Sequence, residues 1–252
     1  MVNMVACGLN LNIIWENKEL NFNNIEQELK NSFADLFILP EMFSTGFVMK
    51  PEKIADRNEE TLNWMKKFAA EKNAAVCGSA SVKENGQFFN RFYFVEPSGE
   101  YNFYDKRHLF AYSGEDEKYA AGKDRVIINF KGWRILLQVC YDLRFPVFAR
   151  NNYDYDIILY VANWPEKRID AWNTLLKARA IENQAYVFGL NRIGADGNNL
   201  HYPESSHCFF ADGTEISEHK NNLVYADFNG ENLKKFRETF PFLGDADSFQ
   251  LL

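Results

Sequence analysis

A cysteine at the end of an apolar run is the first residue of this sequence whose position suggests chemistry. Cys140 closes the run IleLeuLeuGlnValCys and is followed by TyrAspLeuArgPhePro, so a strand is expected to end there and a turn or helix to begin near Arg144. Backbone N–H groups converge at such a junction and favour a thiolate, which makes Cys140 a candidate nucleophile. A buried structural cysteine is the competing interpretation. Cys7, Cys77 and Cys208 lie inside apolar runs and are expected in the core.

Two charged residues also follow apolar stretches. Glu41 comes after AspLeuPheIleLeuPro, and Lys106 lies in TyrAspLysArgHisLeuPhe after a strand-like stretch. A nucleophilic cysteine needs a base, and a carboxylate can accept the thiol proton. Taken singly, a loop glutamate such as Glu41 more often caps a turn, and Lys106 would normally be a solvated surface lysine. Three such residues at the ends of three apolar strands are more informative together.

The three segments resemble the Glu-Lys-Cys motifs of the nitrilase superfamily. LeuProGluMetPhe, TyrAspLysArgHisLeuPhe and ValCysTyrAspLeuArgPhePro occur in the family's order. ValAlaAsnTrpPro at 161–165 and LysAlaArgAlaIleGluAsnGlnAlaTyrVal at 177–187 are similar to further family blocks, so the likeness covers nearly the whole chain. The lysine and cysteine motifs most resemble those of the ω-amidases. The resemblance implies an α/β fold, a four-layer α-β-β-α sandwich with mixed sheets, and a homodimer.

The resemblance also implies a mechanism. Cys140 would be the nucleophile, Glu41 the general base and Lys106 the stabiliser of the oxyanion, with the backbone N–H of Tyr141 as a second donor. Many family members have a second glutamate. Glu115 in the loop after Lys106 is the first choice for that role, and Glu117 is its competitor; the alternative for either is a solvated loop acid.

The substrate implied by the resemblance is a short 2-oxo acid ω-amide such as 2-oxoglutaramate or 2-oxosuccinamate, cleaved to the acid and ammonia. Arg144 either binds the substrate carboxylate or caps a helix, and both interpretations stay open. Other candidate cations are Arg107, His108 and Arg192. Phe43 and Trp164 are expected to form part of the pocket wall. Nitrile hydrolysis and N-carbamoyl amide hydrolysis are alternatives within the family. A non-catalytic family relative that binds a metabolite or partner, and a redox-sensing cysteine protein, are alternatives of other functional classes.

The spacing of apolar residues predicts the elements that position these groups. Strands are expected near the ranges 2–9, 35–39, 74–82, 88–95, 125–130, 135–140, 156–162, 186–191, 207–211 and 224–228. Helices are expected near the ranges 24–32, 59–71, 147–151, 170–184 and 230–238. The helix at 170–184 should bury the face that carries Ala171, Leu175, Ala178 and Ile181. Asn85-Gly86 and Lys131-Gly132 should form hairpin turns.

Composition excludes several classes of protein. A chain of 252 residues with 46% hydrophobic residues can form a sizeable core, and no linker divides it, so one domain over 1–252 is expected, with a docked C-terminal segment at about 238–252. The net charge of −7 argues against nucleic-acid binding, and no apolar run predicts a membrane span. His201, His207 and Cys208 do not match zinc spacing, so no metal or cofactor is expected. Four scattered cysteines and a polar N-terminus favour a cytoplasmic protein.

Overall fold

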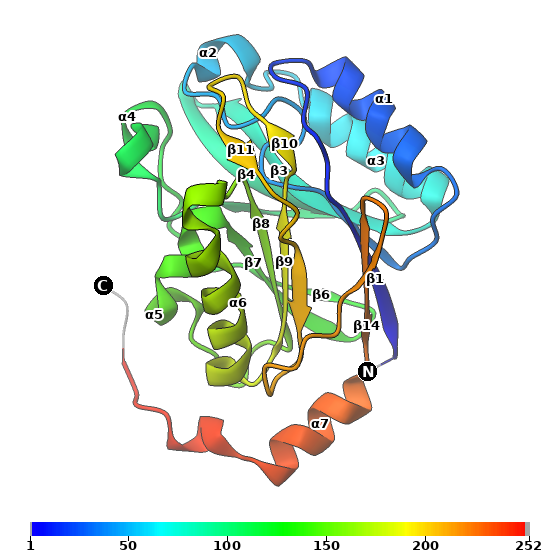
Figure 1. Cartoon of the computed structure of the whole chain (residues 1–252), viewed down its shortest axis with the longest axis vertical. Helices are drawn as coiled ribbons and strands as arrows, with labels where there is room; N and C mark the ends of the chain where they lie inside the picture. Colours follow the sequence, from blue (N-terminus) through cyan, green and yellow to red (C-terminus); the bar gives the residue numbers. More distant parts are fainter. Residues whose placement is uncertain (1, 250–252) are drawn as a thin grey trace.

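Two sheets, of seven and five strands, pack face to face in the computed structural model, which describes residues 2–249 (Figure 1); β10 and β11 form a separate pair. The larger sheet has the order β13-β14-β1-β2-β3-β4-β5 and the smaller sheet the order β12-β9-β8-β7-β6. Both contain parallel and antiparallel pairs, so the predicted mixed sheets are confirmed. The strands of the larger sheet are β1 (Met4–Leu9), β2 (Leu36–Ile38), β3 (Ala75–Glu84), β4 (Gln87–Val95), β5 (Tyr101–Asp105), β13 (Glu218–Lys220) and β14 (Leu223–Phe228). Those of the smaller sheet are β6 (Ile127–Phe130), β7 (Trp133–Val139), β8 (Ile157–Ala162), β9 (Tyr186–Asn191) and β12 (His207–Phe209).

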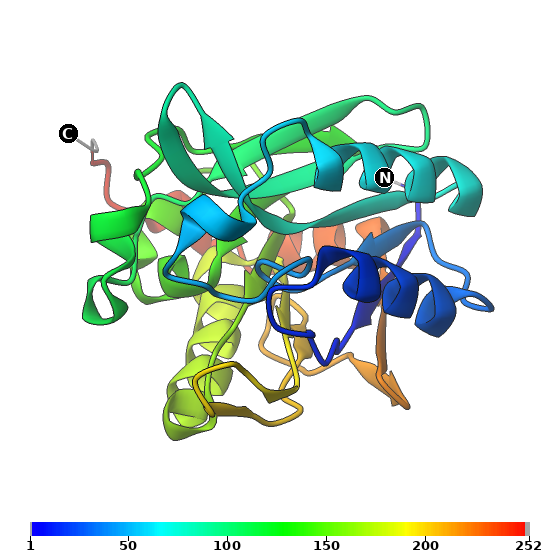
Figure 2. The ribbon, with the colours of Figure 1, turned by 90° about the horizontal axis from the view of Figure 1, so that it is seen from above.

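Helices cover the outer face of each sheet. α1 (Lys18–Leu29) and α3 (Glu60–Lys72) pack on the larger sheet, while α5 (Pro146–Ala149) and α6 (Ile169–Asn183) pack on the smaller one. Figure 2 shows α1 and α3 on one side of the strands and α6 on the other. A third cluster of buried apolar side chains fills the space between the sheets. The predicted α-β-β-α sandwich is therefore confirmed.

Both predicted hairpins are confirmed. Asn85 and Gly86 join β3 to β4, and Lys131 and Gly132 join β6 to β7. All four residues have positive φ, the conformation that a tight turn with the right-handed twist of the strands requires.

Two helices differ from their predictions. α1 begins at Lys18 rather than near Asn24, because the Asn17 side chain caps it by accepting a bond from the Leu20 N–H. The buried face of α6 carries Trp172 and Leu176 instead of the predicted stripe, and Ile181 is 48% exposed. Arg179 and Asn183 are also buried on that face, so polar residues mask its apolar periodicity.

The remaining elements are short. They are α2 (Pro51–Ile54), α4 (Glu115–Lys118), β10 (Gly194–Ala195), β11 (His201–Tyr202) and α7 (Gly230–Thr239). After α7 the chain runs along the lower edge of the molecule in Figure 1, where Leu243 is buried and the Gln184 side chain donates to the Phe240 carbonyl. Residues 1 and 250–252 of the predicted domain, and so the end of the predicted docking segment, lie outside the described residues.

Candidate active site

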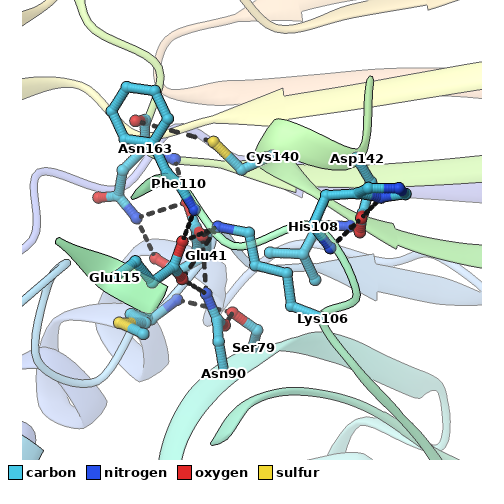
Figure 3. Close-up of polar contacts among 12 residues, drawn as sticks. Glu41, Ser79, Asn90, Lys106, His108, Phe110, Glu115, Cys140, Asp142 and Asn163 are labelled. Atoms are coloured by element: carbon cyan, nitrogen blue, oxygen red, sulfur yellow. Dashed lines mark hydrogen bonds and ion pairs between the residues drawn. The ribbon is translucent and has the colours of Figure 1, made fainter. Parts of the chain in front are cut away.

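Three strand ends bring the candidate residues together. Glu41 lies three residues after β2, Lys106 directly follows β5, and Cys140 directly follows β7. β2 and β5 belong to the larger sheet and β7 to the smaller one, so the site lies where one end of each sheet meets (Figure 3).

The ammonium of Lys106 lies between two carboxylates. Its Nζ is 3.0 Å from Glu41 Oε1, 3.0 Å from Glu115 Oε1 and 2.8 Å from Glu115 Oε2. All three side chains are fully buried. The structure thus brings Glu115 to Lys106, whereas Glu117 is exposed on the outer side of α4.

The charges in this cluster change its pKa values. Burial lowers the pKa of Lys106, but the charges of Glu115 and Glu41 more than offset it and hold that pKa above its usual value, so the lysine stays protonated. Burial raises the pKa of Glu115; Lys106 opposes this and Glu41 adds to it, and the net shift is upward. Burial and the charge of Glu41 raise the pKa of the Cys140 thiol. The resting thiol is therefore neutral and needs a base.

Asn90 and Asn163 hold the two carboxylates in place. The Asn90 side chain donates to Glu41 Oε1 (2.8 Å) and to Glu115 Oε1 (3.2 Å), and its own oxygen accepts from the Ser79 hydroxyl. The Asn163 N–H donates to Glu41 Oε2 at 2.8 Å, and the Asn163 side chain donates to the Glu41 carbonyl. Both Glu41 oxygens are thereby oriented, with one toward Lys106 (Figure 3).

Cys140 lies on a strained turn. Its φ of 45° is in the left-handed region, which is costly for a residue with a side chain. Asp142 supports the turn by accepting from the Val139 N–H (2.9 Å), the Tyr104 hydroxyl (2.8 Å) and the His108 N–H (3.1 Å). The segment after β5 and the turn after β7 are therefore tied to one buried carboxylate.

Sequence reasoning missed Asn90, Asn163 and Asp142 as functional positions. A signal existed for Asn90, which is a polar residue in the aromatic run PhePheAsnArgPhe of β4. Asn163 and Asp142 lie inside the motifs that were recognised, next to Trp164 and Tyr141. Their partners come from distant segments, so the spacing along the chain does not identify them.

A cavity of about 440 Å³ opens onto Cys140. Tyr141, Arg144 and Trp164 line it, together with Glu41 and Lys106, and their role in binding substrate stays a prediction. The prediction for Phe43 is wrong, because this ring is fully buried in the core beside Trp64.

Phe47 takes the place expected of Phe43. It lines the cavity, and its ring centroid is 5.2 Å from Lys106 Nζ. Met42 and Gly46 both have positive φ, so the loop turns twice between Glu41 and Phe47, and Phe43 points inward.

The other candidate cations bind groups of the protein. Arg107 donates to the Lys123 carbonyl, His108 pairs with Asp142, and Arg192 is fully buried with bonds to the Ile13 and Ala195 carbonyls. These three residues do not line the cavity as the structure describes it.

Neither a metal site nor a membrane helix is found in the part of the chain that the structure describes. Within residues 2–249, His, Cys, Asp and Glu side chains form no group of three that could hold a metal ion. Across the same residues, every helix is too short or too polar to cross a membrane.

The chain matches known proteins along nearly its whole length. The carbon-nitrogen hydrolase family model matches residues 6–238. Omega-amidase YafV of Escherichia coli strain K12 is 44% identical over 243 residues, which cover 95% of each chain. A 2-oxoglutaramate amidase of Bacillus subtilis is 30% identical over 231 residues, which cover 88% of this chain and 87% of the relative.

A solved structure is also similar to this chain along its whole length. The protein XC1258 of Xanthomonas campestris, a CN-hydrolase superfamily protein with an arsenic adduct in its active site, superposes with a TM-score of 0.95 at 39% identity over the full length of both chains. The fold, the arrangement at the strand ends and these similarities agree, and the chain belongs to the carbon-nitrogen hydrolase family.

Proposed function

We propose that this protein is an ω-amidase, which cleaves the terminal amide of short 2-oxo acid ω-amides such as 2-oxoglutaramate and 2-oxosuccinamate. The products are the 2-oxo dicarboxylic acid and ammonia. One observation carries the proposal: the buried Glu41–Lys106–Glu115 arrangement lies at the wall of a cavity that is also lined by Cys140. The similarity to an ω-amidase along 95% of the chain supports the choice of substrate.

The reaction begins with removal of the thiol proton. Glu41 accepts it, and the Cys140 sulfur attacks the amide carbon, forming a C–S bond while the carbonyl electrons move to oxygen. Lys106 and the Tyr141 N–H stabilise that oxyanion. Glu41 then gives its proton to the amide nitrogen, the C–N bond breaks, and ammonia leaves a thioester.

Water completes the cycle. Glu41 accepts a proton from water, which attacks the thioester, and collapse of the second tetrahedral species returns the protonated thiol and the acid. Glu115 holds Lys106 in position through two contacts, of 3.0 and 2.8 Å. The neutral thiol implied by its raised pKa is the form from which Glu41 removes a proton.

Arg144 is proposed to bind the carboxylate at the far end of the substrate. It lines the cavity, with its guanidinium carbon 5.1 Å from the centroid of the Trp164 ring. A hydrogen bond between a guanidinium and a carboxylate contributes about 1.5–3 kcal/mol, or roughly ten- to a hundredfold in kcat/KM. Arg144→Met should therefore impair hydrolysis of 2-oxoglutaramate far more than hydrolysis of pentanamide.

A screen for ammonia release across ω-amides, nitriles and N-carbamoyl compounds tests the proposal. The fastest reaction is expected with 2-oxo acid ω-amides; faster hydrolysis of nitriles or carbamoyl compounds would contradict the assignment while leaving the thiol chemistry possible. Cys140→Ala and Cys140→Ser should abolish turnover and leave the thermal unfolding midpoint nearly unchanged. Full activity of Cys140→Ala would refute a covalent mechanism.

The protein is also proposed to need no metal or organic cofactor, since side chains and backbone supply the nucleophile, the base and the oxyanion donors. Dialysis against EDTA should leave activity unchanged; a loss restored by a divalent ion would contradict this.

A cytoplasmic homodimer remains our proposal for the assembled protein. The resemblance to the nitrilase superfamily supports the dimer, and Val147 on α5 and Ile181 on α6 are 53% and 48% exposed. Light scattering should give twice the mass of one 29.3 kDa chain.

A further inference from the structure

Two arginines differ from all others in residues 2–249. The other nine each donate at least one hydrogen bond from the guanidinium to a carbonyl or carboxylate of the protein. Within the described residues, Arg144 and Arg168 have no such acceptor, and both line the cavity at Cys140. Because a guanidinium has five N–H donors, these two side chains present a large unused donor capacity to one space.

Aromatic rings of the cavity wall hold both guanidiniums. Arg144 lies over the Trp164 ring at 5.1 Å, and Arg168 lies over the Phe110 ring at 4.9 Å. Stacking on a ring leaves the N–H edge of a guanidinium free to bind an anion.

The two rings are themselves fixed. Trp164 Nε1 donates to the Arg168 carbonyl at 2.7 Å, and the Phe110 N–H donates to Glu115 Oε2 at 2.6 Å. Phe110, on which Arg168 stacks, is therefore connected to Glu115, the carboxylate that holds Lys106. Trp164, on which Arg144 stacks, is connected to the backbone of Arg168.

Within residues 2–249, no acid that lines the cavity forms an ion pair with either of these arginines. Asp196 accepts from the Tyr202 hydroxyl and from the backbone N–H groups of Asn198 and Leu200 at 2.8–2.9 Å. Glu16 and Lys50 are both exposed and of opposite sign. Within the described residues, Arg144 and Arg168 are therefore unpaired guanidiniums of the cavity that Cys140 also lines.

We propose that Arg168 is a second substrate-binding residue, which acts with Arg144 to bind the 2-oxo acid end of the substrate. A 2-oxo carboxylate presents three acceptor oxygens, whereas one guanidinium fork engages two of them. The second guanidinium supplies donors for the third. A 2-amino acid amide such as glutamine would instead bring an ammonium against the pair, so the arginines select against it. The inference rests on the ω-amidase function proposed above.

The test compares kcat/KM for four amides that share the same chain of five carbons: 2-oxoglutaramate, glutaramate, glutamine and pentanamide. Arg168→Met should lower the value for 2-oxoglutaramate by roughly ten- to a hundredfold and change that for pentanamide by less than about twofold. The preference for 2-oxoglutaramate over glutaramate should shrink, because glutaramate lacks the 2-oxo oxygen. Arg168→Lys should restore part of the loss.

Lys167→Met is the matched control, since it removes a positive charge from an exposed neighbour that does not line the cavity. It should leave all four values unchanged. Equal losses on 2-oxoglutaramate and pentanamide in Arg168→Met would overturn the proposal and assign Arg168 a structural role. Failure of the ω-amidase function itself would look different, because the wild type would then show no preference for the carboxylated amides.

Discussion

Two clusters of three charged residues lie at opposite ends of the smaller sheet. The glutamate–lysine cluster (Glu41, Lys106 and Glu115) places one cation between two acids at the carboxyl end of β7. The aspartate–arginine cluster places one acid, Asp156, between the cations Arg134 and Arg237 before the start of β8.

The balance of charge separates their behaviour. Asp156 accepts from Arg134 and from Arg237, each at 2.8 Å. Although burial alone would raise its pKa, the two arginines hold that pKa below the usual value. In the other cluster one lysine serves two carboxylates, and the pKa of Glu115 is raised. An acid that is paired with two cations, such as Asp156, stabilises the fold. Where two acids share one cation, one carboxylate, proposed above to be Glu41, can accept a proton.

Replacing an acid by its amide should therefore lower activity in the glutamate–lysine cluster and lower stability in the aspartate–arginine cluster. Glu41→Gln removes the proposed base but keeps its shape and one of its two acceptor oxygens. We expect kcat/KM to fall by about three orders of magnitude or more, with little change in the free energy of unfolding. Steady-state kinetics and urea unfolding measure both. Substantial activity in Glu41→Gln would show that Glu41 is not the base, and the two clusters would then not differ in this way.

Asn90→Asp adds a third acid around the single lysine. Asn90 donates to both glutamates, so the substitution replaces a shared donor with a negative charge. The pKa of the neighbouring carboxyl groups should rise, kcat/KM should fall by about a hundredfold, and the acid limb of the pH–rate profile should move to higher pH.

Asn102→Asp provides the control, because Asn102 is exposed on β5 and the substitution adds the same charge far from Lys106. It should leave kinetics and pH profile unchanged. An Asn90→Asp enzyme with the wild-type pH profile would show that Asn90 does not tune the cluster.

The difference between the clusters also marks what the sequence can reveal. Glu41, Lys106 and Cys140 each follow an apolar, strand-like stretch, which marks them as candidates, but it was the resemblance to the nitrilase motifs that implied they form one site. The hairpins at Asn85-Gly86 and Lys131-Gly132 were predictable because local backbone geometry determines them. The hairpins depend on residues that are neighbours in the chain.

Features that depend on distant partners were not predictable. Asp156 is joined to Arg237, 81 residues away, and Asn163 to Glu41, 122 residues away. Phe43 was misplaced because the positive φ values of Met42 and Gly46 reverse the loop, and no periodicity reports such turns. The buried face of α6 was misplaced because Arg179 and Asn183 lie on it.

Asp156→Asn should have the opposite effect to Glu41→Gln. It leaves Arg134 and Arg237 without their charged acceptor, so we expect a loss of about 2 kcal/mol in the free energy of unfolding and normal kcat/KM. Asp154→Asn in the more exposed pair with Arg125 should cost less than about 1 kcal/mol. Equal costs for the two variants would show that burial of Asp156 adds nothing.

The pH dependence of stability should have opposite signs in the two clusters. The folded pKa of Asp156 lies below its unfolded value of 3.8, so its contribution is complete above that pH and is lost as the pH falls through the folded pKa. The folded pKa of Glu115 lies above its unfolded value of 4.5, so the folded state binds more protons there. Stability should consequently decrease as the pH rises from 4.5 through the folded pKa of Glu115.

Urea midpoints between about pH 3 and pH 8 can separate the two effects. The stability lost in Asp156→Asn should shrink only below pH 3.8, because only there does the wild-type carboxylate lose its charge. Glu115→Gln should lack the wild type's decrease in stability above pH 4.5, since a glutamine cannot ionise. Each variant differs from the wild type in its free energy of unfolding. If these two differences changed with pH in the same direction, the proposed contrast between an acid paired with two cations and two acids that share one cation would be wrong.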